Sequence, residues 1–429
     1  MGTAAIKRRN LLRWAAGSAA FVSLSSFGRA AQTKDEANPA PVRAITRGPK
    51  FHWFGYYDKL QVDSTGRYAL GMEVDFEHRS PRPDDTVRIG MVDLRDKDRW
   101  IELGTSRAWN WQQGCMLQWR PGHESEVIWN DRREGQFVSY ILDVRSGRKR
   151  TVPHPVYALS PDGRWAVSTD FRRLNDTRPG YGYAGIADPN RNVAAPQDAG
   201  IWKVDLETGE QSLLLSLAEA VGATHASPVQ PGGFSAGSKH WFNHLLVAPD
   251  GRRFTFLHRW RGQAEGTSWK TRMFTAGADG QGLHLLIPSG KVSHFIWRDP
   301  SHILAYAGYG PEAKQWRFQV FEDLMDRAEA VEGMPQGDGH CTYLPGNQWI
   351  LCDSYPDKER RQHLYLFHVP ERRLVPLGRF LSPPQYTGEW RCDMHPKPSR
   401  DGRSAIIDSP HGSDGRQIYL VDIAGLAKT

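Results

Sequence analysis

Apolar runs that end in tight turns recur along the chain from about residue 50 to the C-terminus. The clearest copies combine an apolar start with Asp, Gly and Arg, and they occupy residues 159–164, 247–252 and 398–403. Weaker copies occupy residues 62–67, 119–122, 297–300 and 343–346. Proline presets the first dihedral angle of a turn and glycine accepts a positive one, so each copy predicts a two-stranded hairpin.

A second pattern alternates with the first. It consists of alternating apolar residues, an Asp, another apolar residue and usually a Gly, as at residues 91–94, 141–144, 204–206 and 420–423. Period-two alternation that ends in an Asp-containing turn is typical of an antiparallel strand and its hairpin. Together the two patterns predict an all-β fold, a seven-bladed β-propeller of four-stranded antiparallel blades over residues 49–429. A β-sandwich would not explain their fixed order.

The N-terminus has the organisation of an export signal. A basic segment with Arg8 and Arg9 precedes a short apolar stretch and a small-residue cleavage site near Ala30. This pattern predicts a twin-arginine-type signal peptide over residues 1–30, an Ala/Pro linker over 31–48, and a periplasmic or secreted protein. The apolar stretch is too short to span a bilayer, and no later segment approaches the required length, so we expect no membrane span.

The formal net charge of +7 changes little in this picture. Five basic residues and no acidic one fall in residues 1–31, so removal of the signal leaves a charge of about +2. No basic block with interleaved aromatic residues follows, so we expect no nucleic-acid partner. The four cysteines form no CxxC pair. We expect a monomer.

Alignment of the seven turns identifies one equivalent position at the start of each innermost strand. The residues at that position are Lys59, Cys115, Val156, His244, His294, His340 and His395. Four consecutive blades therefore carry His at the same place, where the chains converge on the central channel. Any one of these histidines could simply satisfy backbone hydrogen bonds.

Together, four imidazoles and the Lys59 ammonium at one mouth of the propeller favour a functional role. Clustered imidazoles bind divalent metals or transfer protons near neutral pH, so we expect a site for Mn, Zn or Ca at the four histidines. Asp338 and Asp393 could orient the imidazoles or cap turns. Cys341 is adjacent to His340 and Cys392 lies three residues before His395, so a mixed His/Cys zinc site is the alternative.

Other polar residues fall near the same mouth. Tyr157 lies one residue beyond the equivalent position of the third blade, and Arg173 lies sixteen residues later. The remaining candidates lie at strand ends or in the long insertion 174–200. Long loops on a rigid scaffold tend to serve binding. They are Gln113, Asn130 and Lys59 for catalysis, and Arg132, Arg259 and Tyr181 for substrate binding. For each of them a blade-edge hydrogen bond or a surface ion pair is the structural alternative.

Two families of secreted propellers share features with this chain. Residues 340–343, 353–357 and 391–396 resemble the oligogalacturonate lyase domain, a seven-bladed propeller whose family binds manganese through histidines and a glutamine. Ulvan lyases look similar in another region, because that family uses a tyrosine followed sixteen residues later by an arginine, as in Tyr157 and Arg173. Ulvan lyases also use paired histidines from the preceding blade, where this chain has Gln113 and Asn130.

The resemblance implies β-elimination at a uronate-containing glycan. This reaction needs a cation beside the carboxylate, a base for the C5 proton and an acid for the leaving oxygen. Arg173 or a histidine-bound metal would supply the cation, and Tyr157, His244 or Lys59 the proton transfers. Two alternatives remain: a non-catalytic propeller that binds a protein or glycan, and a glycoside hydrolase, which needs two facing carboxylates such as Asp58 and Asp131.

Overall fold

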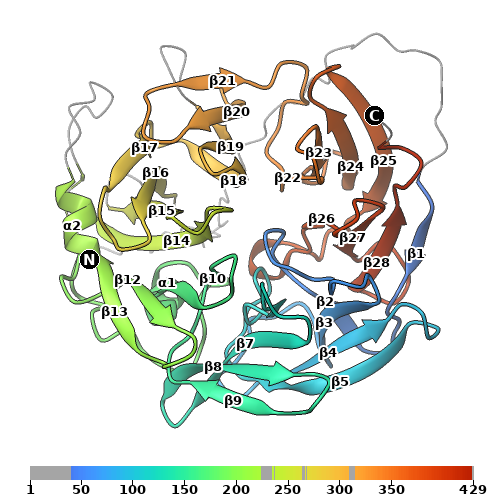
Figure 1. Ribbon diagram of the computed structural model, residues 1–429, viewed down its shortest axis with the longest axis horizontal. Coiled ribbons are helices and arrows are strands. Elements are labelled where there is room, and N and C mark those ends of the chain that lie inside the picture. The colour runs from blue at the N-terminus through green and yellow to red at the C-terminus, as the bar shows by residue number, and fades with distance from the viewer. Residues whose placement is uncertain are drawn as a thin grey trace, which may run out of the picture.

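The computed structural model of the chain describes residues 40–223, 234–235, 237–262, 266, 268–308 and 315–427. These residues form seven four-stranded antiparallel sheets arranged as blades around a central axis (Figure 1). The predicted all-β, seven-bladed β-propeller is therefore confirmed. The predicted signal peptide, residues 1–30, lies outside the described residues.

Each of the first three blades runs in chain order from the centre of the wheel to its rim. Blade 1 contains β2 (Phe51–Trp53), β3 (Tyr68–Val74), β4 (Val87–Asp93) and β5 (Arg99–Ser106). Blade 2 contains β6 (Gln118–Trp119), β7 (Glu126–Arg133), β8 (Gln136–Asp143) and β9 (Lys149–Val152). Blade 3 contains β10 (Ala158–Leu159), β11 (Trp165–Thr169), β12 (Gly200–Asp205) and β13 (Gln211–Ser216).

The next three blades repeat this order. Blade 4 contains β14 (Lys239–Val247), β15 (Arg253–Arg261), β16 (Lys270–Gly277) and β17 (His284–Ile287). Blade 5 contains β18 (Val292–Asp299), β19 (His302–Ala307), β20 (Arg317–Glu322) and β21 (Ala328–Ala330). Blade 6 contains β22 (Thr342–Tyr343), β23 (Trp349–Asp353), β24 (Arg361–His368) and β25 (Arg373–Leu381).

The seventh blade closes the ring with strands from both ends of the described chain. Its inner strands are β26 (Lys397–Pro398), β27 (Ser404–Ser409) and β28 (Gln417–Asp422), and its rim strand is β1 (Val42–Ala44), which pairs with β28 (Figure 1). The strand β1 lies within residues 31–48, which we expected to form a linker. The propeller therefore begins before residue 49, because the rim of blade 7 needs a partner strand.

The turns have the geometry that their residues predict. In the turn after β10, the Gly163 amide donates to the Ser160 carbonyl, Gly163 has a φ of 68°, and the Ser160 hydroxyl donates to the Asp162 carboxylate. In the second pattern, the Asp205 carboxylate accepts from the backbone amides of the two residues that follow Leu206. These local bonds specify the hairpins, and the buried apolar residues between them fill the space between blades.

Two helices lie in the insertions that the strand pattern does not explain. Helix α1 (Phe171–Thr177) follows β11, and the Asp170 carboxylate caps its N-terminus. Helix α2 (Leu217–Gly222) follows β13 and begins with a capping box between Ser216 and Glu219. Neither of these described helices has the length or apolar character that crossing a membrane requires.

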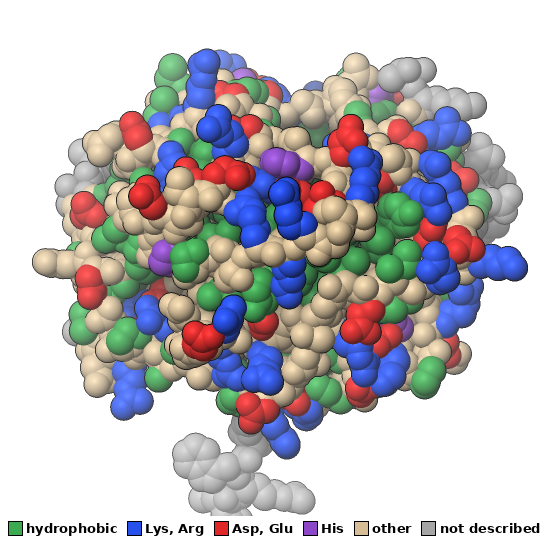
Figure 2. All heavy atoms as spheres, turned by 60° about the horizontal axis from the view of Figure 1, so that its bottom comes forward, with side chains coloured by type: hydrophobic (Ala, Val, Ile, Leu, Met, Phe, Trp, Pro, Cys, Tyr) green, Lys and Arg blue, Asp and Glu red, His purple; other side chains and the backbone are tan. Residues whose placement is uncertain are grey.

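Basic and acidic side chains are interspersed over the face drawn in Figure 2, which bears no continuous basic stripe.

Candidate active site

The four histidines of the aligned position converge near the axis of the propeller. His244 lies in β14, His294 in β18, His340 just before β22, and His395 just before β26. The ring centroids of His294 and His340 are 4.1 Å apart, and those of His340 and His395 are 4.3 Å apart. All four side chains are buried. The structure therefore brings together the residues that the turn alignment selected.

Irregular backbone aims two of these rings at the centre. The pairing of β14 with β15 shifts register between Asn243 and Leu246, and His244 in this bulge has a φ of 49°. His395 has a φ of 44°. A β-bulge re-aims the side chain of the extra residue, and such bulges are frequent next to active sites.

Two tyrosines that the sequence analysis missed pack among the histidines. The Tyr57 ring lies 5.3 to 6.4 Å from the rings of all four histidines. Its hydroxyl donates to the Phe295 carbonyl and accepts from the Phe295 amide. The Tyr56 ring lies 4.8 Å from that of His244 and 5.3 Å from that of His395. The adjacent aromatic residues after β2 were the available signal for them.

His340, Asp393 and His395 have ligand atoms that all lie within 4.8 Å of one another. The Nε2 atoms of His340 and His395 are buried and have no hydrogen-bond partner among the described residues. Burial and the neighbouring His340 lower the pKa of His395 well below its usual range, so its nitrogen lone pair is available. Two imidazoles and a carboxylate with open positions suit a divalent metal such as Mn or Zn.

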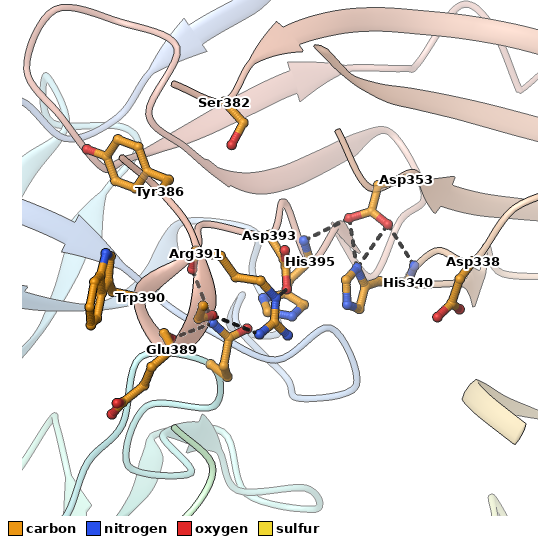
Figure 3. A network of polar contacts seen from close by, with 12 residues as sticks. Asp338, His340, Asp353, Ser382, Tyr386, Glu389, Trp390, Arg391, Asp393 and His395 are labelled. Carbon is orange, nitrogen blue, oxygen red and sulfur yellow. Dashed lines mark hydrogen bonds and ion pairs between the residues drawn. The ribbon is translucent and has the colours of Figure 1, made fainter. Parts of the chain in front are cut away.

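Asp353 holds two members of this group in place. Its carboxylate accepts from the Nδ1 atom of His340 at 2.9 Å and from the backbone amide of His395 at 3.2 Å (Figure 3). Burial lowers the pKa of His340, but the Asp353 carboxylate outweighs that effect and the net pKa is raised. Because Asp353 holds the Nδ1 hydrogen, the Nε2 atom is the one available to a metal, and metal binding there would release a proton.

The residues of this candidate metal site differ from the four histidines that we expected. Asp393 belongs to it as a ligand candidate, whereas His244 is occupied elsewhere, with Nε2 bonded to Asp58 and Nδ1 to Tyr56. The geometry does not support the cysteine alternative, because the group of mutually close ligand atoms among the described residues contains no cysteine.

His294, whose ring packs against that of His340, lines a cavity. Its Nδ1 atom is 2.9 Å from the Asp338 carboxylate, which fixes the imidazole and places the Nδ1 hydrogen on that side. Burial lowers the pKa of His294, outweighing Asp338, so the ring is neutral near pH 7. Its Nε2 atom is then an unprotonated base.

The cavity holds about 290 Å³ and opens beside the histidines. Its lining combines aromatic rings with charged groups: Tyr56, Arg178, Tyr181, Arg259, Trp269, Thr271, Gly290, Val292, Ser293, His294, Trp316, Asp338 and Tyr355. The Nε and Nη1 atoms of Arg259 and the Nη1 atom of Arg178 are buried and have no hydrogen-bond partner among the described residues. Buried guanidinium nitrogens with unused hydrogens are suited to an anionic ligand.

Aromatic contacts hold the two arginines in place. The Arg178 guanidinium lies 3.8 Å from the centroid of the Tyr181 ring and 4.5 Å from that of Trp269. The Arg259 guanidinium lies 5.8 Å from the same Trp269 ring. Arg259 and Tyr181 were expected to bind substrate, and both line the cavity. Arg178 and Trp269 were missed because each lies outside the repeating patterns.

Lys59 and Asp58 form a buried pair beside His244. The Lys59 ammonium is 2.8 Å from Asp58, and the His244 Nε2 atom is 3.0 Å from the other oxygen of that carboxylate. Burial raises the pKa of Asp58, but Lys59 and His244 outweigh it and lower the pKa to about 2. Burial lowers the pKa of His244 to about 4 despite Asp58. Asp58 is therefore a carboxylate that is hydrogen-bonded to the neutral imidazole of His244.

Arg173 does not face the cavity, contrary to the expectation. All its guanidinium nitrogens are engaged inside the protein, with the carbonyls of His240, Asn190, Val193 and Ala194 and with the Asp188 carboxylate. The reason is α1, which turns Arg173 toward the insertion that follows it rather than toward the axis. It anchors that insertion and has no hydrogen left for a substrate carboxylate.

Tyr157 is also engaged in the interior. Its hydroxyl accepts from Gln113 Nε2 at 2.6 Å and from the His244 backbone amide at 3.0 Å, and it donates to Asn243 Oδ1. It does not line the cavity. Tyr157 and Gln113 therefore support the β14 bulge that carries His244, which replaces the expected catalytic roles.

Two further candidates are structural for similar reasons. The Asn130 side chain is fully buried, donating to the Val156 carbonyl and Tyr183 and accepting from the Val156 amide. Arg132 donates to the Pro83 carbonyl, outside the cavity. The spacing of Tyr157 and Arg173 thus matches the ulvan lyase pattern without placing either side chain at the cavity.

Comparison with known proteins identifies the fold. No model of a protein family matches the chain, and no curated protein does. Among solved structures, it is similar to oligogalacturonate lyase from Vibrio parahaemolyticus, with 14% identity, a TM-score of 0.63, and coverage of 91% of this chain and 95% of the other.

Two other solved structures place this similarity in context. An oligogalacturonate lyase in complex with manganese gives 14% identity, a TM-score of 0.64, and coverage of 89% and 93%. The tricorn protease gives 12% identity and a TM-score of 0.51, covering 88% of this chain but 34% of the other. These similarities support the propeller and agree with the resemblance noted in residues 340–396, although identities this low show the fold alone.

Proposed function

We propose that this protein is a lyase that cleaves uronate-containing oligosaccharides by β-elimination in the cavity at the propeller mouth. The observation that carries the proposal is the composition of that cavity. Two guanidinium groups with unused hydrogens face the same space as a neutral imidazole, beside a group of residues suited to a divalent metal. The oligogalacturonate lyases, whose fold the chain shares, support the proposal.

Arg259 and Arg178 would bind the uronate carboxylate. A guanidinium matches a carboxylate with paired hydrogen bonds, and these two are already held by Tyr181 and Trp269, so little conformational freedom is lost on binding. The neutralised carboxylate withdraws electrons from C5 and acidifies its proton. Trp269 and Trp316 offer faces on which sugar rings can pack.

His294 is the base that the cavity offers. Asp338 holds its Nδ1 hydrogen, so Nε2 can accept the C5 proton, and the resulting imidazolium is stabilised by the same carboxylate. Ser293 also donates to Asp338 and fixes its position.

His340, Asp393 and His395 would hold a divalent metal. When bound, the metal would add positive charge that stabilises the enolate-like form of the substrate carboxylate. Asp353 keeps His340 in the tautomer that such a ligand needs.

The glycoside hydrolase alternative is less well supported. Such an enzyme needs an acid and a second carboxylate on opposite sides of the sugar. Asp338 is the one carboxylate among the described residues that line the cavity, and it is bonded to His294 and Ser293. A non-catalytic propeller that binds an acidic glycan would use the guanidinium hydrogens, but it would need neither the His294 base nor the metal group.

The test incubates the protein with oligomers of galacturonate and other uronates and follows the ultraviolet absorbance of the unsaturated product. We expect product formation that a chelator abolishes and that added Mn²⁺ restores. Arg259→Ala should raise KM roughly 10- to 100-fold, the range for losing a charge-assisted hydrogen bond. The matched control is Arg132→Ala, which removes an arginine outside the cavity and should leave KM unchanged. No absorbance change with any uronate would refute the proposal.

We also infer that the protein acts outside the cytoplasm, as a monomer, after export by the twin-arginine-type signal. The basic N-terminal segment supports this, and an acidic glycan is a substrate that a periplasmic or secreted enzyme would meet. Replacing Arg8 and Arg9 with Lys should leave the protein in the cytoplasm, as cell fractionation would show.

A further inference from the structure

Three phenols line the cavity, and their hydroxyl groups differ in what holds them. The Tyr181 hydroxyl accepts a hydrogen bond from Arg391 at 2.7 Å. The Tyr355 ring packs beside the rings of His294 and His340, on the side of the proposed base. Tyr56 is different, because its hydroxyl is bonded to a buried imidazole that is itself bonded to a carboxylate.

The chain from Asp58 through His244 to Tyr56 has a defined direction. Lys59 lies 2.8 Å from Asp58 and keeps it as a carboxylate, which can only accept hydrogen bonds. The His244 Nε2 atom, 3.0 Å from that carboxylate, must therefore carry the ring hydrogen. The lone pair is then on Nδ1, which accepts from the Tyr56 hydroxyl at 3.4 Å.

This direction leaves the Tyr56 hydrogen in a weak bond at the cavity. A distance of 3.4 Å is beyond the usual range for a hydroxyl donor, so little energy is lost when the hydroxyl turns toward a closer acceptor. The ring itself is held by contacts with Tyr57, His244 and His395. Tyr56 thus combines a fixed position with a transferable hydrogen.

We propose that Tyr56 donates the proton to the leaving oxygen, and that Asp58 and His244 position its hydroxyl. This assignment rests on the proposed lyase function. His294 takes the C5 proton, and the electrons of the C5–H bond form the C4=C5 double bond. The C4–O bond breaks, and its electron pair takes the Tyr56 proton. The phenolate regains a proton from solvent after the product leaves, while His294 releases the one it took, so protons balance over the cycle.

The proton donor and the base are then different residues of one cavity. His294 belongs to β18 of blade 5 and Tyr56 to the segment after β2 of blade 1. Tyr57 contacts Tyr56, His244 and His294, and so links the two groups. An elimination requires both, since proton removal at C5 and bond cleavage at C4 occur at neighbouring carbons.

The experiment compares Tyr56→Phe with Tyr355→Phe on two substrates. The first substrate is a galacturonate trimer, and the second is a galacturonide with a 4-nitrophenyl ether at O4, whose 4-nitrophenolate leaving group needs no proton. We expect Tyr56→Phe to lower kcat on the trimer about 10²- to 10⁴-fold, the usual contribution of a general acid, and to retain kcat within about tenfold of wild type on the activated substrate. Tyr355→Phe should change both values by less than about tenfold.

Binding of the trimer to a His294→Ala background, measured by calorimetry, should be unchanged by Tyr56→Phe. Asp58→Asn should also lower kcat on the trimer and, like Tyr56→Phe, should largely retain kcat on the activated substrate. Equal losses on both substrates, or an unchanged kcat on the trimer, would overturn the assignment while leaving the lyase function intact. A wild-type protein inactive on both substrates would overturn the proposed function and this assignment together.

Discussion

Replacement of Arg173 by Ala tests whether this residue anchors the structure or takes part in catalysis. Arg173 makes five hydrogen bonds at 2.6 to 3.2 Å, and one of them goes to Asp188, whose side chain is 1% exposed. The substitution leaves that carboxylate buried beside unpaired carbonyl groups. Loss of one partner of a buried ion pair costs about 3–5 kcal/mol.

This cost converts into a measurable change of melting temperature. At an unfolding entropy of roughly 2.1 cal/mol/K per residue, a propeller of about 390 residues loses about 1.2 °C of Tm per kcal/mol. We therefore expect Arg173→Ala to lower Tm by about 4–6 °C. Differential scanning calorimetry at a fixed scan rate measures this shift.

Two variants control the measurement. Arg172→Ala removes the neighbouring arginine, which is 35% exposed and pairs with Asp170, so its loss should cost about 1 kcal/mol or less. Arg173→Ala combined with Asp188→Asn removes the uncompensated charge and should recover part of the lost Tm. If Arg173→Ala kept its Tm within about 1 °C while losing uronate lyase activity more than about 100-fold, the anchoring role would be refuted.

Three further predictions follow from the metal group, the His244 pair and the closing strand. Added Mn²⁺ should raise the Tm of the wild-type protein but not of His395→Ala, as thermal melts with and without metal would show; an equal rise in both would contradict the assigned ligands. The pKa of His244 is lowered to about 4 and that of Asp58 to about 2, so the unfolded chain takes up protons first as the pH falls. Stability is then lost from about pH 6.5 to 4 through His244 and from about 3.8 to 2 through Asp58, with a His244 contribution of roughly 3 kcal/mol. Melts across this range should show a smaller loss of stability with falling pH for His244→Gln, and an unchanged slope would contradict a buried, neutral His244. Deletion of the residues up to Ala44 removes the strand that pairs with β28, and limited proteolysis should then cleave blade 7 first.

The blade pattern was readable from sequence because it is local. A turn such as that at Gly163 is specified by its own four residues and their bonds, and the strands on either side alternate in polarity. Repetition of this unit predicts the wheel, since each blade buries its faces against its neighbours. The same alignment selected His244, His294, His340 and His395, because equivalent positions in blades face the same axis.

The roles of individual groups depended on contacts between distant parts of the chain. Helix α1 turns Arg173 away from the axis, and hydrogen bonds from Gln113 and the His244 amide engage Tyr157, although spacing alone placed both at the mouth. Arg178 and Tyr56 lie outside the repeats, so no periodicity marked them.

The sequence by itself therefore determined the architecture and the ring of histidines, since both arise from a repeated local pattern. The tertiary structure decided which imidazole is unpartnered, which is held by a carboxylate and which guanidinium faces the cavity. Those properties depend on burial and on hydrogen bonds between residues far apart in sequence, and no local pattern encodes them.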